Sequence, residues 1–263
     1  MSEIEFLKMD VRQYDSLKTI EDIDVVFHLA ANANVPFSVE HPEYDFTTNV
    51  IGTFHILKTC LDSDLKKVVY TSSAAAYGEP DYLPIDEKHP LAPISPYGAS
   101  KLAGELLGLA YFSTYGLPFT VVRIFNSYGE RQRRYVMYDL VKKLGFNPEV
   151  LEVLGTGEET RAFCYIKDTV DAILLVAEKQ SSIGETYNVG GETPLRIQEL
   201  VELILEQLEL KGKTKVYYTG KSWKGDIRNL NPDISKIKKL GFEPQTSLKI
   251  GLANLISWIH SLA

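Results

Sequence analysis

The sequence has little cysteine, no long apolar run and no excess of positive charge, and each of these absences excludes a class of protein. Cys60 and Cys164 are too few for a disulfide framework and suit a reducing cytoplasm. No apolar run approaches the length of a membrane span, and no signal peptide opens the chain. A net charge of −7 argues against non-specific nucleic-acid binding. We therefore expect a cytoplasmic protein that binds neither membranes nor nucleic acid.

Apolar residues make up 44% of the 263 residues, which is enough for one large core or for two lobes that share an interface. Continuous apolar runs at 24–29, 67–70 and 119–125 predict strands of a parallel sheet that is covered on both faces. Residues 42–61 and 97–115 have the spacing of helices. Further strands are predicted at 150–154 and 187–189, and further helices at 136–144, 168–178, 196–208 and 248–262.

The residues with the clearest chemical meaning follow the second predicted strand. Ser95 and Pro96 predict a helix start, because serine is a good N-cap and proline suits the first helical position. Tyr97 and Lys101 then share one face of this helix. An ammonium one turn away favours the phenolate and lowers the phenol pKa from its usual value of about 10. With the Ser73 hydroxyl nearby, such a group can move a proton on and off an alcohol while a hydride goes to a carrier.

A tyrosine and a lysine four residues apart also occur by chance, and an isolated pair is more often two neighbours on an exposed helix face. Here the pair follows an apolar strand, a run of hydroxyl side chains and a loop at 80–96 that carries five prolines. A long loop beside reactive side chains is more often functional than filler. This context favours a catalytic role.

Several segments, in the right order, resemble the extended short-chain dehydrogenase/reductase family in its NAD-dependent nucleotide-sugar epimerase/dehydratase branch. They are DVVFHLAA (24–31), TTNVIGT (47–53), VVYTSSAAAYG (68–78), SPYGASK (95–101), VVRIFNSYG (121–129) and TYNVGG (186–191). The resemblance runs from near Asp10 to the end of the sequence. It implies a Rossmann-like doubly wound parallel sheet with a smaller α/β substrate-binding lobe.

The same resemblance divides the chain into two domains that alternate along the sequence. Residues 1–125 and 164–185 are expected to form the NAD-binding domain, with the C-terminal helix 248–263 packed on the body of the protein. Residues 126–163 and 186–247 are expected to form the nucleotide-sugar-binding domain, with the active site between the two.

NAD is the cofactor that the resemblance implies. The residues that would bind it are Asp10, Val11, Leu29, Ala30, Ala31, Asn49, Thr71, Ser72, Tyr97, Lys101 and Phe125. Asp10 ends a short strand-like run at 5–9, and in the family such an aspartate lies beside the adenine; the alternative is a strand end and a turn. Asn49 falls inside a predicted helix, where an amide that faces a core is unfavourable, and this favours a functional role.

A nucleotide-sugar, most simply a UDP-sugar, is the implied substrate. The residues that would bind it are Ser73, Asn126, Val153, Leu154, Arg161 and Asp226. Asn126 follows a predicted strand, and ligands of open α/β sheets bind beyond the carboxyl ends of strands. Arg161 corresponds to a family arginine that contacts the diphosphate, since a guanidinium can bind two oxygens at once. The segment KSWKGD (221–226) departs from the family, because Trp223 stands where an arginine is usual.

The reaction follows from the catalytic residues that the resemblance implies, Ser73, Tyr97 and Lys101, and from the alanines at 74–76. Dehydratases and decarboxylases of the family carry an acidic residue at these positions, and a methyl group cannot move a proton. The resemblance therefore implies a sugar 4-epimerase of the UDP-glucose/UDP-galactose type that acts through a 4-keto intermediate. The alternatives are a dehydratase, decarboxylase or 4-keto reductase of the same family, or an inactive binder.

A glycine-rich turn with the pattern GxxGxxG is absent near the N-terminus, although the family uses it to hold the pyrophosphate. We therefore expect the sheet to lack its first strands and the strand at 24–29 to be an unpaired edge. Residues 5–9 are expected either to move against that strand or to pair with another chain. The sequence as written is expected to bind NAD weakly and to have little activity alone.

The family resemblance also implies a homodimer. In many family members, helices that correspond to 43–61 and 97–115 pack as a four-helix bundle across the dimer interface. No metal site is predicted.

Overall fold

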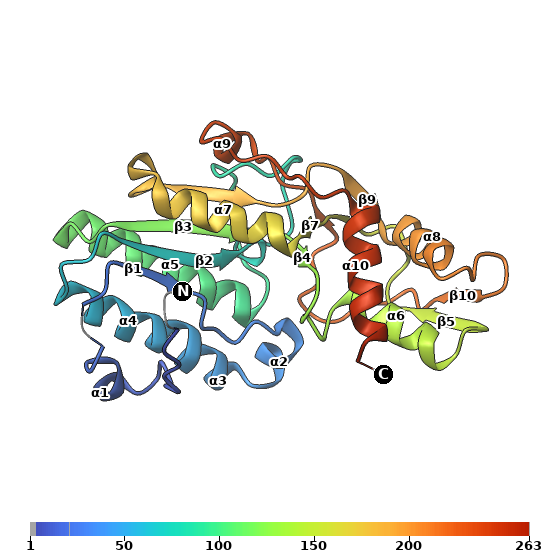
Figure 1. The fold of residues 1–263 in the computed structure, drawn as a ribbon, viewed down its shortest axis with the longest axis horizontal. Coiled ribbons are helices and arrows are strands. Elements are labelled where there is room, and N and C mark those ends of the chain that lie inside the picture. The colour runs from blue at the N-terminus through green and yellow to red at the C-terminus, as the bar shows by residue number, and fades with distance from the viewer. Residues whose placement is uncertain (1–3, 21, 263) are drawn as a thin grey trace.

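The structure, a computed structural model, describes residues 4–20 and 22–262. A parallel sheet lies at its centre in the order β1-β2-β3-β8. These strands are β1 (Val25–His28), β2 (Lys67–Ser73), β3 (Phe119–Ile124) and β8 (Thr186–Val189). Figure 1 shows this sheet with helices around it on one side of the molecule and a smaller group of elements on the other. The predicted α/β class, a Rossmann-like doubly wound sheet, is confirmed.

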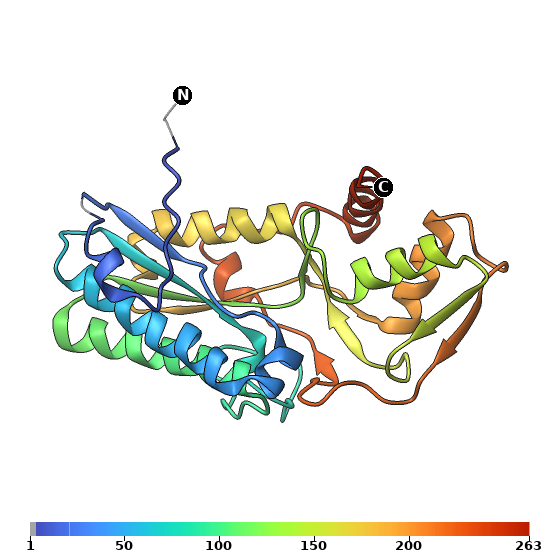
Figure 2. The same ribbon diagram turned by 90° about the horizontal axis from the view of Figure 1, so that it is seen from below.

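The sheet carries helices on both faces, because successive side chains of a strand point to opposite sides. On one face, Val68 and Tyr70 of β2 belong to an apolar cluster with Leu57 of helix α4 (Gly52–Leu61). On the other face, Val69 packs with Val176 of helix α7 (Ile166–Glu178). In Figure 2 the sheet lies between α7 and the helices of the opposite face. The continuous apolar runs of the strands follow from this double coverage.

Helix α5 (Pro96–Tyr115) has the ends that its sequence predicts. The Ser95 Oγ accepts a hydrogen bond from the Gly98 N–H at 3.1 Å, and Pro96 occupies the first turn. Gly116 ends the helix with a φ of +74°, a left-handed conformation that glycine adopts without strain. The caps fix the first turn of α5, and therefore the place of Tyr97.

The long helix predicted at 42–61 is interrupted by one wide turn. It consists of α3 (Pro42–Phe46), a π-helical turn (Thr47–Ile51) and α4. A π turn adds one residue to the helical ladder and is frequent at functional sites. Asn49 lies in this turn and is buried.

The smaller group of elements has an apolar core of its own. It contains α6 (Val136–Phe146), α8 (Ile197–Gln207), α10 (Leu248–His260) and the parallel strands β5 (Val150–Val153) and β10 (Lys215–Tyr218). The buried residues of α10 pack against α6 and α8 in this core. Short elements connect the two groups or cover their edges. They are α1 (Tyr14–Leu17), α2 (Val35–Glu40), the 3-10 turns Ala74–Ala76 and Gln180–Ser182, β4 (Ser127–Tyr128), β6 (Thr160–Ala162), β7 (Cys164–Tyr165), β9 (Pro194–Arg196), β11 (Asn229–Leu230) and α9 (Ser235–Lys238).

Two predicted domain assignments differ from the structure. Residues 186–189 form β8 of the main sheet rather than part of the smaller lobe, and Ile234, Ile237 and Phe242 pack on the same face of that sheet as α7. The helix at 248–260 packs on the smaller group because its apolar side matches the apolar faces of α6 and α8. Helical periodicity alone does not tell which core a helix joins.

The expected pairing of residues 5–9 with the strand at 24–29 is wrong, and their pairing with another chain stays a prediction. These residues form no strand, and the Phe6 side chain is 86% exposed. A strand needs a hydrogen-bonding neighbour, and in the described residues β1 pairs with β2 alone, on its other side. β1 is therefore an edge strand, as expected. Among the described helices, none has both the length and the apolar content to cross a lipid bilayer.

Candidate active site

The carboxyl ends of the parallel strands bring the first group of predicted site residues to one edge of the sheet. β1 ends before Leu29–Ala30–Ala31, where Leu29 and Ala30 are exposed. β2 ends at Ser73, and β3 ends just before Phe125 and Asn126. Ligands of open α/β sheets bind at this kind of edge.

Ser73 begins a 3-10 turn and caps it. Its Oγ accepts a hydrogen bond from the Ala75 N–H at 3.2 Å. The hydroxyl has used an acceptor site in this bond, so its own hydrogen remains available for donation to a ligand. The same hydroxyl lies close enough to the Tyr97 phenol to lower its pKa. The structure thus brings Ser73 and Tyr97 together across 24 positions of sequence.

The pKa of Tyr97 differs from its predicted direction. Burial raises this pKa to about 12, and the Ser73 hydroxyl only partly opposes the rise. Tyr135 and Asp45 raise it further, since negative or potentially negative groups disfavour a phenolate. The expectation that Lys101 lowers this pKa is therefore wrong in the structure, where Tyr97 is a neutral phenol at pH 7.

Lys101 is 3% exposed, and its ammonium lies over the ring of Tyr70 at 4.3 Å from the ring centre. Tyr70 also donates a hydrogen bond to the Lys101 carbonyl at 3.1 Å. Burial lowers the pKa of Lys101 to about 7, while Glu105 and Asp45 act in the opposite direction. This lysine can therefore lose its proton near neutral pH, which an exposed lysine cannot.

Asn49 joins the loop after β1 to helix α5. Its Oδ1 accepts from the Asn32 N–H at 2.7 Å, and its Nδ2 lies 3.1 Å from Asp45 Oδ1 and 2.9 Å from Ser100 Oγ. Ser100 donates in turn to the Tyr97 carbonyl at 3.0 Å. The Asn49 side chain is thus fully used in protein contacts, and it positions the helix that carries Tyr97.

Two predicted substrate residues from the smaller group are paired with one another. The Arg161 Nη2 donates to Asp226 Oδ1 at 2.8 Å, and both side chains are largely buried. Gly225 packs against Ser95, since a Cβ on Gly225 would meet the Ser95 Cβ at 3.1 Å. The loop that carries Asp226 therefore reaches the beginning of α5. Tyr97 lies in the first turn of this helix.

The next four predicted residues differ in whether they have a polar atom free to bind a ligand. Ser72 Oγ and Asn126 Nδ2 are buried without a hydrogen-bond partner in the described residues. The Thr71 hydroxyl donates to the His28 carbonyl at 3.0 Å, and the Phe125 side chain is packed with Tyr77 and Ile85. Only the first two therefore present free polar atoms.

Four predicted residues lie elsewhere or are engaged in protein contacts. Val153 is buried in the smaller core, so any ligand contact would fall to its backbone, whereas Leu154 is exposed. Val11 packs on the start of α4, where a Cβ on Gly52 would meet Val11 Cγ2 at 2.6 Å. The Asp10 carboxylate binds Arg12, whose hydrogen bonds lower the Asp10 pKa to about 2.

A buried network behind α5 carries no signal in the sequence that would select its residues. Arg123 forms an ion pair with Glu105 at 2.7 Å and donates to the Tyr77 hydroxyl at 2.9 Å. Tyr77 donates to Asn188 at 2.7 Å, and Asn188 donates to the Ile85 carbonyl of the proline-rich loop at 2.9 Å. The network fixes this loop to the sheet and to the helix that carries Tyr97.

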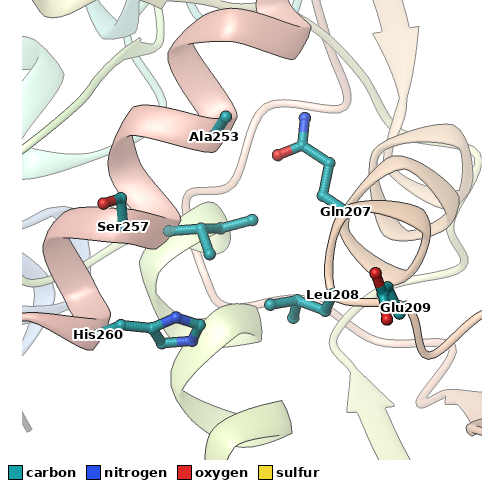
Figure 3. A pocket seen from close by; sticks show the side chains of 7 residues that line it. Gln207, Leu208, Glu209, Ala253, Ser257 and His260 are labelled. Carbon is teal, nitrogen blue, oxygen red and sulfur yellow. The ribbon is translucent and has the colours of Figure 1, made fainter.

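The unpartnered Ser72 hydroxyl and Asn126 amide, with the exposed backbone after β1, fit a polar ligand laid across the sheet edge. The described residues contain no group of three or more histidine, cysteine, aspartate or glutamate side chains that could hold a metal ion. A hollow of about 460 Å³ between α8 and α10 is lined by Gln207, Leu208, Glu209, Ala253, Ile256, Ser257 and His260 (Figure 3). It contains no predicted site residue.

A half-buried tyrosine and a buried lysine beside a strand-end serine, on a doubly wound sheet, define a short-chain dehydrogenase/reductase type of active site. Residues 1–255 match the family described as GDP-mannose 4,6 dehydratase, and the chain belongs to this family of enzymes.

Three similar proteins cover almost the whole chain. A Methanocaldococcus jannaschii protein provisionally named UDP-glucose 4-epimerase is 36% identical over 98% of this chain and 84% of its own length. The structure of the Thermotoga maritima UDP-glucose 4-epimerase with UDP-glucose has a TM-score of 0.91 and 31% identity, and covers 98% of this chain and 84% of the other. A Bacillus cereus UDP-glucuronic acid 4-epimerase with UDP-glucuronic acid and NAD has a TM-score of 0.89 and 32% identity, over 98% of this chain and 82% of the other.

Proposed function

We propose that this protein is an NAD-dependent nucleotide-sugar 4-epimerase. The observation that carries the proposal is the convergence of Ser73, Tyr97 and Lys101 beside a turn made only of alanines, Ala74–Ala76. The turn offers no side chain that can move a second proton. A site with one acid–base tyrosine suits the inversion of a single hydroxyl carbon better than loss of water.

In the proposed reaction Tyr97 is the acid–base group. Its phenolate, formed when the phenol loses its proton, takes the proton from the sugar O4 as the C4 hydride leaves, and the resulting phenol later returns that proton to the same oxygen. Ser73 donates its free hydroxyl hydrogen to O4, because its Oγ already accepts from Ala75. Lys101, with its ammonium charged, stabilises the phenolate that accepts this proton.

NAD would take the hydride from C4 and return it to the opposite face of the 4-keto sugar, so it is regenerated in each cycle. The groups that would hold it are Ser72, whose hydroxyl is unpartnered, Lys101, and the backbone at 29–31. Relatives crystallised with NAD support this choice.

The nucleotide-sugar would lie between the sheet edge and the smaller group, which we propose as the substrate-binding half. Asn126 offers an unpartnered amide at the end of β3. Arg161 would bind the diphosphate and Asp226 the ribose, so the ion pair that these residues now form would have to open. UDP is proposed as the nucleotide because relatives carry UDP-sugars.

The proposal is tested by incubating the full chain with NAD and, separately, UDP-glucose or UDP-glucuronate, and separating the products by chromatography. We expect the C4 epimer to form with NAD regenerated and no change in mass. A product lighter by one water would show a 4,6-dehydratase, the reaction in the family description. Stoichiometric consumption of a reduced nicotinamide would show a 4-keto reductase.

We also propose a homodimer that packs α4 and α5 of two chains together. Phe54 of α4 and Leu106 of α5 are exposed, and so are Ala99 and Ala110, which continue an apolar stripe at helical spacing on α5. We expect a dimer in sedimentation velocity at micromolar concentration, and Leu106→Glu should shift it to monomer. Leu174→Glu, at an exposed leucine on α7, is the matched control and should remain dimeric. A monomeric wild-type protein would contradict the proposal.

A further inference from the structure

The Lys101 ammonium on α5 is buried and rests against an aromatic ring. The residue is 3% exposed, and its Nζ lies over the ring of Tyr70 on β2, 4.3 Å from the ring centre. Among residues 4–20 and 22–262, no carboxylate lies within ion-pair distance of this Nζ. The face of an aromatic ring is its negative side and attracts an ammonium, most strongly where water is excluded. The Tyr70 ring is therefore the direct contact of this buried charge.

Tyr70 also holds the backbone of the helical turn that carries Lys101. Its hydroxyl donates a hydrogen bond to the Lys101 carbonyl at 3.1 Å. Gly104 makes room for this hydroxyl, because a Cβ at residue 104 would overlap the Tyr70 oxygen and would lie 2.6 Å from the Tyr70 Cζ. The side chain of Tyr70 thus meets α5 at two points, the ammonium of Lys101 and the backbone of the same residue.

The surroundings of Tyr70 keep its ring from turning away from Lys101. Tyr70 is fully buried and belongs to the apolar cluster that includes residues of α4. Phe119 on β3 stacks with the Tyr70 ring at a centroid distance of 5.9 Å, and the His28 ring on β1 lies 5.5 Å away. Because a close-packed core leaves little space for a second rotamer, the ring is a fixed surface for the ammonium.

This contact relates the three proposed catalytic side chains to one another. β2 ends at Ser73, three residues after Tyr70. α5 carries Tyr97 one turn before Lys101. Tyr70 joins the strand that carries the serine to the helix that carries the tyrosine and the lysine, at the level of the lysine.

The carboxylates near Lys101 act on its protonation rather than on its position. Burial lowers the pKa of Lys101 to about 7, and Glu105 on α5 opposes this effect most, followed by Asp45 on α3. The Glu105 carboxylate is itself held by Arg123 on β3 at 2.7 Å. Both carboxylates act from beyond contact distance, whereas the ring of Tyr70 touches the ammonium. The place of the ammonium is therefore set by the ring.

We propose that Tyr70 is a positioning residue, whose ring face holds the Lys101 ammonium where it stabilises the phenolate of Tyr97. In this role Tyr70 acts through Lys101 and exchanges no proton itself. The hydroxyl of Tyr70 anchors the ring to α5, and the ring face carries the effect on the lysine. The catalytic part of this inference rests on the proposed function, whereas the contact between the ring and the ammonium is tested without turnover.

The contact is tested first in the wild-type protein by NMR. Lysine is labelled with ¹³C at Cε, and the Lys101 signal is assigned by its loss in Lys101→Arg. The Lys101 Hε protons should lie upfield of those of the exposed lysines, because the ring face shields them. They should also show nuclear Overhauser effects to the ring protons of Tyr70. Absence of these Overhauser effects would overturn the proposal.

Two substitutions of Tyr70 separate the ring from the hydroxyl. Tyr70→Phe keeps the ring and should leave the Lys101 Hε signals upfield. Tyr70→Leu removes the ring face and should move these signals downfield, towards those of the exposed lysines. Tyr187→Leu is the matched control, because Tyr187 is a tyrosine of 3% exposure that packs on the opposite face of the same sheet. It should leave the Lys101 signals unchanged.

Activity gives a second measurement, in which a conservative variant should rescue the loss. If the wild-type protein is an epimerase, Tyr70→Leu should lower kcat by about tenfold, the size of a buried cation–π contact, with KM unchanged. Tyr70→Phe and Tyr187→Leu should keep most of the rate. An equal loss of kcat in either of these two variants would show a merely structural role and contradict the proposal. If the wild-type protein shows no epimerase activity but the NMR results are as expected, the proposed function fails and the contact stands.

Should Tyr70→Leu fail to fold, Gly104→Ala takes its place. The added Cβ would lie 2.6 Å from the Tyr70 Cζ, so the ring must move while the tyrosine itself is kept. The Lys101 Hε signals should then move downfield as in Tyr70→Leu, and unchanged signals would contradict the proposal. The wild-type Overhauser effects decide the question even if neither variant folds.

Discussion

Replacing Tyr97 by phenylalanine is expected to lower the rate of nucleotide-sugar epimerisation by a factor of about a hundred or more. Phenylalanine keeps the ring but has no proton to exchange, and loss of a positioned acid–base group typically has an effect of this size. The phenol has a pKa raised to about 12, so it must lose its own proton before it can accept the proton of the sugar O4. Initial rates with the two epimers as substrate measure the effect in both directions.

The control for this substitution lies on the same helix. Tyr115 is 63% exposed near the end of α5, and Tyr115→Phe should leave the rate unchanged. Nucleotide-sugar binding, measured by calorimetry, should be nearly the same in Tyr97→Phe and in the wild type. A Tyr97→Phe protein that keeps most of its activity would show that another group exchanges the proton.

Replacing Arg123 by methionine is expected to cost about 3–5 kcal/mol in the free energy of unfolding, because it leaves the carboxylate of Glu105 buried without its partner. The two side chains are 5% and 1% exposed and meet at 2.7 Å. Burial disfavours the charge of Arg123, but the hydrogen bonds and charge of Glu105 raise its pKa above the ordinary value. Urea unfolding gives the difference directly.

Two comparisons separate this pair from ordinary ion pairs. Arg123→Met/Glu105→Leu removes both charges and should recover most of the lost stability, since a buried pair can often be exchanged for apolar residues. Lys167→Met breaks the exposed pair with Asp171 and should cost less than about 1 kcal/mol. If Arg123→Met is as mild as Lys167→Met, the buried network does not stabilise the fold.

Helix α5 could be predicted from the sequence because its signals are local. Ser95, Pro96 and Gly116 act on the backbone within one turn of themselves, and the structure places the helix ends where they predict. The same holds for the strands of the sheet, whose apolar runs reflect burial on both faces.

Elements that depend on a distant partner could not be predicted in this way. Residues 5–9 have the composition of a strand but pair with no strand among residues 4–20 and 22–262. Strands of two or three residues, such as β11, are too short to show any periodicity, and the register of the β6 pairs is set by tertiary contact.

In the candidate site, too, local signals could be predicted from the sequence and tertiary contacts could not. Tyr97 and Lys101 were found because their spacing alone has chemical meaning. The buried pair of Arg123 and Glu105 carries no such signal, since it joins a strand to a helix through a contact that only the folded chain makes. The pKa of Tyr97 was predicted in the wrong direction because burial, which a sequence does not display, outweighs a neighbouring charge.

The π turn at Thr47–Ile51 has a consequence for the rotational phase of the helix that contains it. A regular helix advances about 100° per residue, so one added residue offsets everything before the turn from everything after it. Asp45, before the turn, faces Asn32, whereas Thr53, after it, meets His28 Nε2 at 2.9 Å. Deleting one residue from the turn would bring both halves into a common phase, and one of the two contacts would be lost. The wide turn therefore lets the two halves of one helix face different partners. The half before the turn contacts the loop after β1, and the half after it contacts β1 itself.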